Sequence, residues 1–417
     1  MRTIIAVFAA LAVVFTSACV SSPQESASYR VGEGDVLVLV LLDGFRADYL
    51  DRGHSPTLRA MADAGVSASM RPSFPSVSAP NHTTLVTGRR PDNHGVIDNL
   101  MMDQAIPGWF GAGNAAVDHD PRWWAEATPL YITATRQGVR SGEMFWYGAD
   151  IPYDGDLPAD RRPEGALSLN AKVDAVLAWF DRPAAERPRF VVLPVFEVDE
   201  AGHVFGPNAP ETNAAIAAAD AAVTRLIEGL RARNALDGAN FVIAADHGMT
   251  EVSTEQRVIL LDDFVDASRL VVTTYGAYIG VNPRPGFEAE VERAMLQERE
   301  HLECWRKNEI PARFHYGAHW RVPAIFCLAD RGWLVMTRAI GEAARAHYPS
   351  FNGNHGYDPA DPEMAALFIA NGPAFRRGVT LPAFDNVDAY PMMAEMLGVE
   401  PGEHDGDADT LRAALRE

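Results

Sequence analysis

The chain has few cysteines, few lysines and no long apolar run after its first residues. Three cysteines occur among 417 residues and none has C-x-x-C spacing, which excludes a metal site built from paired cysteines. The only lysines are Lys172 and Lys307, and the formal net charge is −20. Wrapping nucleic acid requires a basic surface, so that class of function is excluded. Without a second long apolar stretch, the body of the chain is predicted to be soluble.

The sequence does contain enough hydrophobic residues, 47%, for a large core. Four apolar runs have the length and composition of strands that are buried on both faces of a parallel sheet. These runs are Val36–Leu42, Phe190–Val198, Phe241–Ala245 and Met364–Ala370. Segments of helical composition alternate with them, which predicts an α/β domain over residues 35–417 with a mostly parallel central sheet flanked by helices. From about residue 253 to 347 shorter alternating segments predict an inserted α+β segment.

The first residues resemble a targeting segment. Arg2 precedes an apolar stretch, Ile4–Phe15, that is too short to span a membrane, so residues 1–18 are predicted to be a signal peptide. Cys19 then follows in a sequence similar to a bacterial lipoprotein acylation site, although ordinary cleavage near Ala18 would leave Cys19 inert. Residues 19–34 are predicted to be a flexible tether. The expected location is the periplasm, with membrane contact only through this lipid anchor.

Export would place the remaining cysteines, Cys304 and Cys327, where disulfides persist. One disulfide between them and two unpaired buried thiols are both compatible with the sequence.

Acids and histidines gather where the apolar runs end. Asp43, Asp199 and Asp246 each follow such a run, and three histidines stand nearby: His203, His247 and His355. Because ligands bind at the carboxyl ends of strands in open α/β sheets, these side chains are expected to meet at one edge. Mixed nitrogen and oxygen ligands suit zinc. Any one of them alone could be an ordinary turn acid or core histidine, but an acid cluster of this size would repel itself without a cation.

Ser78 is the candidate nucleophile. It lies in P-S-F-P-S-V-S-A-P-N-H, with a predicted helix beginning just beyond it. A serine hydroxyl needs a base or a metal to activate it, and the chain has no G-x-S-x-G motif of the α/β-hydrolase type. Metal activation is the remaining route. Taken alone, Ser78 could equally be a helix-capping hydroxyl.

Six motifs in this order carry a resemblance to a known family. They are L-L-D-G-F-R, P-S-F-P-S-V-S-A-P-N-H, H-G-V-I-D-N, D-E-A-G-H, A-D-H-G-M and N-H-G-Y-D. Together they are similar to the nucleotide pyrophosphatase/phosphodiesterase family of the alkaline phosphatase superfamily, and the resemblance runs from Val36 to near the C-terminus. It implies an alkaline phosphatase-like fold and a metal-dependent phosphoric diester hydrolase.

The resemblance also implies a role for each motif residue. Asp43, Ser78, Asp246 and His247 would bind one zinc ion, and Asp199, His203 and His355 a second. Asn99 would hold a non-bridging phosphate oxygen. Ser78 would carry the phosphoryl group as a covalent intermediate.

Two departures from the family pattern concern the substrate, expected to be a small-molecule phosphodiester. Ser78 replaces the usual Thr, which keeps the hydroxyl. Ala79 stands where nucleotide-cleaving members often carry Phe, which predicts weak nucleobase selectivity unless Trp146, Tyr147 or Tyr153 supplies a ring. A phosphomonoesterase or phosphonate hydrolase on the same scaffold, or a binding protein without catalysis, are the alternatives. The oligomeric state is left open.

Overall fold

A computed structural model describes residues 35–162 and 167–416. The predicted signal peptide, the Cys19 acylation site and the tether lie outside these residues. Within them, no helix combines the length and the apolar composition that crossing a membrane requires.

A nine-stranded sheet forms the centre of the molecule, in the order β18-β2-β17-β8-β1-β7-β5-β6, with β19 also paired to β2. Its strands are β1 (Val36–Leu42), β2 (Val66–Arg71), β5 (Ser141–Met144), β6 (Asp160–Arg162), β7 (Phe190–Val195), β8 (Ala239–Ala244), β17 (Ala366–Asn371), β18 (Val379–Thr380) and β19 (Phe384–Asp385). Strand β1 is parallel to both β7 and β8, and β5 is parallel to β6 and β7. Only β17 runs against its two neighbours. The predicted mostly parallel α/β sheet is confirmed.

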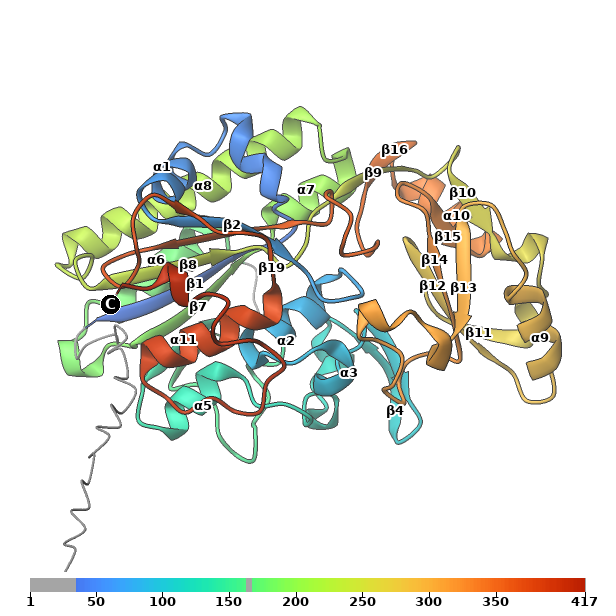
Figure 1. The fold of residues 1–417 in the computed structure, drawn as a ribbon, viewed down its shortest axis with the longest axis horizontal. Helices are drawn as coiled ribbons and strands as arrows, with labels where there is room; N and C mark the ends of the chain where they lie inside the picture. Colours follow the sequence, from blue (N-terminus) through green and yellow to red (C-terminus); the bar gives the residue numbers. More distant parts are fainter. Residues whose placement is uncertain (1–34, 163–166, 417) are drawn as a thin grey trace, which may run out of the picture.

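Helices cover both faces of this sheet (Figure 1). One layer holds α1 (Pro56–Ala64), α6 (Leu169–Trp179) and α8 (Pro210–Ala232), and the other α2 (Ser78–Thr87), α5 (Leu130–Arg136) and α11 (Ala389–Leu397). The buried residues of α8 show why it packs there, because they recur on one face at helical spacing. They include Ile216, Ala219, Val223, Leu226 and Leu230.

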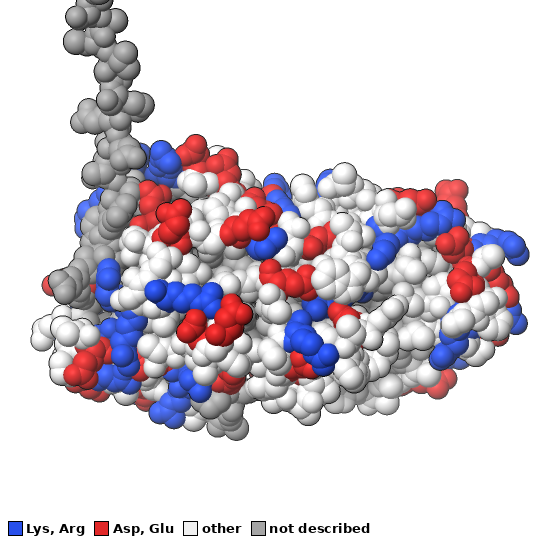
Figure 2. Space-filling view, turned by 90° about the horizontal axis from the view of Figure 1, so that it is seen from below, with Lys and Arg blue, Asp and Glu red and all other residues white. Residues whose placement is uncertain are grey.

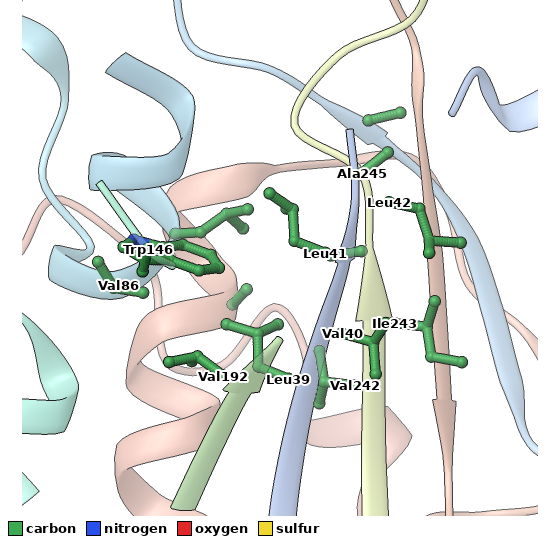
Figure 3. Close-up of a cluster of buried hydrophobic side chains, with 14 of the residues drawn as sticks. Leu39, Val40, Leu41, Leu42, Val86, Trp146, Val192, Val242, Ile243 and Ala245 are labelled. Carbon is green, nitrogen blue, oxygen red and sulfur yellow. The ribbon is translucent and has the colours of Figure 1, made fainter. Parts of the chain in front are cut away.

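The core lies on both sides of β1. All seven of its residues are at most 2% exposed. Figure 3 shows Leu39 and Leu41 pointing to one side of the strand and Val40 and Leu42 to the other. Side chains of a strand alternate between its faces, so a strand covered on both faces needs an unbroken apolar run.

Residues 253–347 form a second sheet at one end of the molecule (Figure 1). Its order is β11-β12-β14-β13, all antiparallel, from β11 (Leu270–Thr274), β12 (Tyr278–Pro283), β13 (Leu302–Arg306) and β14 (Ile325–Ala329). This sheet has its own apolar cluster. Cys304 and Cys327 lie directly opposite each other on β13 and β14 and form a disulfide.

Residues 253–347 form a second unit that contains further short elements. These are β10 (Val258–Leu260), α9 (Glu288–Met295), β15 (Leu334–Met336) and α10 (Arg338–His347). Strands β9 (Thr250–Ser253) and β16 (Phe351–Asn354) pair where the chain enters and leaves it. The remaining α-helices and strands of the described residues are α3 (Pro91–His94), β3 (Leu100–Asp103), β4 (Ile106–Gly111), α4 (Ala115–Asp118) and α7 (Glu197–Phe205).

Candidate active site

The direction of the strands brings distant residues to one edge of the sheet. Asp43 follows β1 and Asp246 lies two residues beyond β8, and these strands are parallel, so both acids leave the sheet at the same edge. Strand β17 is antiparallel, so the loop that precedes it, with His355, reaches that edge as well. Asp199 and His203 are one turn apart on α7, which follows β7.

The first cluster consists of Asp43, Asp246 and His247, all at most 2% exposed. The Nε2 atom of His247 lies 3.1 Å from Asp246 Oδ2 and 3.5 Å from Asp43 Oδ1. Ser78, the first residue of α2, places its Oγ 3.2 Å from the same Nε2 atom and 3.5 Å from Asp43 Oδ1. The hydroxyl oxygen of Ser78 thus lies within 3.5 Å of two of the three side chains of the first cluster.

The second cluster consists of Asp199, His203 and His355. The two Nε2 atoms of His203 and His355 are 3.0 Å apart, and each lies 3.5 Å from an oxygen of Asp199. The rings of His355 and His247 stack with their centroids 3.6 Å apart, so the two clusters are neighbours.

The hydrogen bonds of the three histidines show which nitrogen of each ring can bind a metal. The Nδ1 atoms of His203, His247 and His355 lie 2.9–3.0 Å from the backbone oxygens of Gly353, Gly248 and Ser76 respectively. A carbonyl oxygen only accepts, so each Nδ1 carries the proton and each Nε2 presents a lone pair. In the second cluster two lone pairs therefore face each other beside a carboxylate, an arrangement that a bound cation satisfies.

A bound cation would also stabilise the ionised acids of the first cluster. Burial, together with the negative charges of Asp246 and Asp199, raises the pKa of the Asp43 carboxyl well above its usual range. A divalent cation between these groups balances the charge that makes ionisation unfavourable.

His82 is a site residue for which the sequence suggested no role. It is fully buried on α2, and its Nε2 lies 3.1 Å from Asp43 Oδ2 and 3.4 Å from Asp246 Oδ2. The Nε2–H group donates to Asp43 and orients that carboxylate, as hydrogen bonds around metal ligands commonly do. The signal was present in the sequence, because residues four apart on a helix share a face and His82 is four residues after Ser78.

Asn99 is brought to the nucleophile by a backbone contact. Its Oδ1 accepts a hydrogen bond of 2.8 Å from the backbone N–H of Ala79. With the oxygen engaged, the side-chain NH2 group is the part of Asn99 that can donate to a phosphate oxygen.

Asp98, next to Asn99, links the segment before β3 to strand β12 of the second sheet. Its carboxylate is 2% exposed and accepts hydrogen bonds from the Tyr278 hydroxyl at 2.8 Å and the backbone N–H of Leu100 at 3.2 Å. Burial raises the pKa of Asp98 to about 7.

This raised pKa predicts a pH-dependent stability. Between about pH 4 and 7 the unfolded chain releases the Asp98 proton while the folded chain keeps it, so the free energy of unfolding falls as pH rises and then levels off. We expect Asp98→Asn, which keeps an acceptor for Tyr278, to have a higher Tm than the parent protein at pH 8 and a similar Tm at pH 4. Thermal denaturation across this range measures the difference. A difference in Tm between Asp98→Asn and the parent protein that is equal at pH 4 and pH 8 would contradict the prediction.

A cavity of about 460 Å³ opens onto Ser78, Asp43 and Asp199. Its wall contains four aromatic rings: Phe145, Trp146, Tyr147 and Phe196. Lys172 also lines it, with Nζ 5.1 Å from the centre of the Phe196 ring and 3.6 Å from Glu197 Oε1.

Of the two residues predicted to contact the substrate, Trp146 lines this cavity and Tyr153 does not. Trp146 lines it and packs beside Val86 of α2 (Figure 3). Tyr153 is not among the lining residues and is buried instead, with its hydroxyl against Tyr131. The structure therefore offers no support for Tyr153 as a substrate contact, because packing between side chains, which the sequence does not reveal, directs its ring inward. Ala79 is also fully buried and does not line the cavity.

Comparisons with known proteins agree with these motifs. The model of the type I phosphodiesterase/nucleotide pyrophosphatase family matches residues 37–358. An uncharacterized pyrophosphatase/phosphodiesterase of Schizosaccharomyces pombe is 33% identical over 390 residues, which cover 89% of this chain and 78% of that protein. The bovine ectonucleotide pyrophosphatase/phosphodiesterase family member 3 is 29% identical over 91% of this chain, which spans only 44% of its length.

The fold has close solved counterparts. An inactive variant of murine ectonucleotide pyrophosphatase/phosphodiesterase 5, in complex with AMP, superposes with a TM-score of 0.85 and is 32% identical, covering 92% of this chain and 100% of that one. The resemblance found in the sequence is thereby confirmed: the chain belongs to the type I phosphodiesterase/nucleotide pyrophosphatase family of metal-dependent phosphodiester hydrolases.

Proposed function

We propose that this protein hydrolyses the phosphodiester or pyrophosphate bond of a small molecule through a covalent phosphoryl-Ser78 intermediate, with one zinc ion held in each cluster. The observation that carries this proposal is the position of the Ser78 hydroxyl. It is 3.2 Å from His247 Nε2, at the point where the first cluster meets the cavity.

Each residue of the site has a part in this reaction. When bound, zinc would lower the pKa of a hydroxyl or water ligand and balance phosphate charge. Ser78 Oγ attacks phosphorus, the Asn99 amide donates to a non-bridging oxygen, and His82 fixes the Asp43 carboxylate. His203, His247 and His355 keep their Nε2 atoms aimed inward through their hydrogen bonds to backbone oxygens.

The charges around Ser78 favour diesters over monoesters, whose extra negative oxygen calls for an additional cationic side chain. Four arginines in or near the Asp43 and Ser78 motifs bind elsewhere, and one of them, Arg71, pairs with Asp385. Arg46 binds Asp48 and the Met249 backbone oxygen, Arg89 binds the Glu126 backbone oxygen, and Arg90 binds Asp385. Lys172 reaches the cavity but lies beside Glu197.

A matched pair of substrates tests this proposal. We expect the zinc-loaded protein to hydrolyse bis(4-nitrophenyl) phosphate faster than 4-nitrophenyl phosphate, measured as kcat/KM for release of the same nitrophenolate. A faster monoester would favour the phosphomonoesterase alternative. No turnover of either ester would contradict the proposed activity.

The retained group of the substrate would occupy the cavity with the four rings. The murine relative was solved in complex with AMP, which supports a nucleoside monophosphate as the retained group. The sequence predicted weak nucleobase selectivity because Ala79 offers no ring, but the rings of Phe145, Tyr147 and Phe196 line the cavity independently of Ala79.

Tyr147→Ala tests whether these rings bind a base. Base stacking on an aromatic ring contributes roughly 1–3 kcal/mol. We therefore expect kcat/KM for a nucleoside 5′-phosphate nitrophenyl ester to fall about tenfold or more, since about 1.4 kcal/mol corresponds to tenfold. The methyl nitrophenyl ester has no base to stack and serves as the control. Equal losses for both esters would show that Tyr147 supports the site without binding the base.

Three further proposals concern the location, the anchor and the partner of the whole protein. Export to the periplasm and a lipid anchor at Cys19 follow from the first residues of the sequence alone. On the face drawn in Figure 2, the described acidic and basic side chains are interspersed, which agrees with a small-molecule partner instead of nucleic acid.

A further inference from the structure

Glu143 is a buried acid in the strand that leads to the aromatic wall of the cavity. It is the third residue of β5, between Val192 of β7 and Arg161 of β6, and it is 1% exposed. Within the described residues, Oε1 has one hydrogen-bond partner and Oε2 is buried without any. Burying an acid in this way opposes folding more than an apolar side chain of the same length would. The carboxyl group therefore points to a role other than packing.

The surroundings of Glu143 favour its neutral form. Burial raises the pKa of the Glu143 carboxyl well above its usual range, against the opposing effect of the hydrogen bond from the Trp146 backbone. The side chain thus offers Trp146 an acceptor oxygen instead of a charge.

The hydrogen bond of Glu143 closes the turn from which the wall begins. Its Oε1 accepts from the backbone N–H of Trp146. Inside this turn Phe145 has a φ of 56°, a left-handed conformation that residues other than glycine rarely adopt. Such a conformation persists only where surrounding contacts hold it. Phe145, Trp146 and Tyr147 all line the cavity beside Ser78, so the turn sets where their rings lie.

The wall also contacts the first cluster through His82. The His82 ring centroid lies 4.9 Å from that of Trp146 and 4.8 Å from that of Tyr147. His82 is itself fixed, because its Nε2 lies within 3.4 Å of oxygens of both Asp43 and Asp246. If the turn loosens, the part that shifts is therefore the segment 145–147 and not the cluster.

We propose that Glu143 is a positioning residue that, through its hydrogen bond to Trp146, holds residues 145–147 where their rings contact the retained group of the substrate. The proposal rests on the proposed phosphodiesterase function and names a residue that sets its specificity. Glu143 does not itself line the cavity, so it acts through the wall.

Two conservative substitutions separate the hydrogen bond from the acid. Glu143→Gln keeps an acceptor oxygen at the same reach, whereas Glu143→Asp keeps the acid but is one methylene shorter. For the nucleoside 5′-phosphate nitrophenyl ester, we expect Glu143→Asp to raise KM about fivefold, part of the contribution of stacking, with kcat nearly unchanged. Glu143→Gln should keep the KM of the parent protein. The methyl nitrophenyl ester has no base and should keep its KM in both variants.

Asp220→Ala is the matched control for the loss of a buried acceptor. Asp220 of α8 is 4% exposed and accepts the backbone N–H groups of Thr57 and Leu58, and it does not line the cavity. Its loss should lower the Tm and leave KM for both esters unchanged. An unchanged KM for the nucleoside ester in Glu143→Asp would overturn the proposal, as would an equal rise in Glu143→Gln.

Binding separates failure of this proposal from failure of the proposed function. In the zinc-loaded Ser78→Ala background, the Kd of a nucleoside 5′-monophosphate by calorimetry should rise about fivefold with Glu143→Asp and stay the same with Glu143→Gln. This pattern, without turnover of either ester by the protein that retains Ser78, would support the positioning role and contradict the proposed hydrolysis. The same Kd with Glu143, Glu143→Gln and Glu143→Asp would overturn the positioning role.

Discussion

Replacing Ser78 with alanine is expected to lower kcat/KM for any diester substrate by about a thousandfold or more. The variant lacks the oxygen that bonds to phosphorus, and loss of a nucleophile is among the largest single-residue effects in covalent catalysis. The other ligands of the first cluster, Asp43, Asp246 and His247, remain. Metal content should therefore stay close to that of the parent protein. Substrate turnover and elemental analysis on the same preparation measure both quantities.

Two variants serve as comparisons for Ser78→Ala. Ser78→Thr keeps a hydroxyl at the position and is expected to retain much of the activity. Ser73→Ala removes a buried hydroxyl from the same loop, one that donates to Asn386 Oδ1 at 2.9 Å and touches neither cluster. It should lower the Tm while leaving activity. Appreciable turnover by Ser78→Ala would exclude Ser78 as the nucleophile.

Removal of metal is expected to abolish activity, and zinc is expected to restore it. Two clusters of three Asp and His side chains each have the composition of catalytic zinc sites. The parent protein should contain about two ions per chain. His355→Ala should retain only one, because the second cluster loses a ligand while the first keeps all of its own. His54→Ala, a substitution at an exposed histidine, is the matched control and should keep both.

Stability should follow metal content as well. Binding to the folded chain alone raises the free energy of unfolding, and the buried acids Asp43 and Asp246 lose their counter-charge when the ion leaves. We therefore expect chelation to lower the Tm of the parent protein more than that of His355→Ala. Fully active protein without bound transition metal would contradict the metal dependence.

Local patterns in the sequence were sufficient to predict the central strand and the edge of the sheet where the acids lie. The run Val36–Leu42 is apolar throughout because both faces of β1 are covered, and that pattern alone identified a central strand. The acids that follow β1 and β8 were placed correctly at one edge because parallel strands end at the same edge. A change from long to short apolar runs predicted an inserted segment from about residue 253 to 347.

Contacts between distant residues were not visible in the same way. Tyr153 is as aromatic as Trp146, but only Trp146 lines the cavity. The hydrogen bond from Tyr278 to Asp98 crosses 180 positions of sequence, and no local pattern marks it. His82 stood in a motif, but its contact with Asp43 depends on how α2 packs on the sheet.

The sequence by itself determined the α/β class, the family and the set of acids, histidines and serine available for chemistry, because these depend on residue type and on order along the chain. Only the tertiary structure decided how these residues combine. The reversed direction of β17 carries His355 to the common edge, and three backbone oxygens fix which nitrogen of each histidine faces inward. Helix α7 carries Asp199 to the wall of the cavity beside Ser78. Each of these is a relation between segments far apart in the chain, which packing creates and composition does not encode.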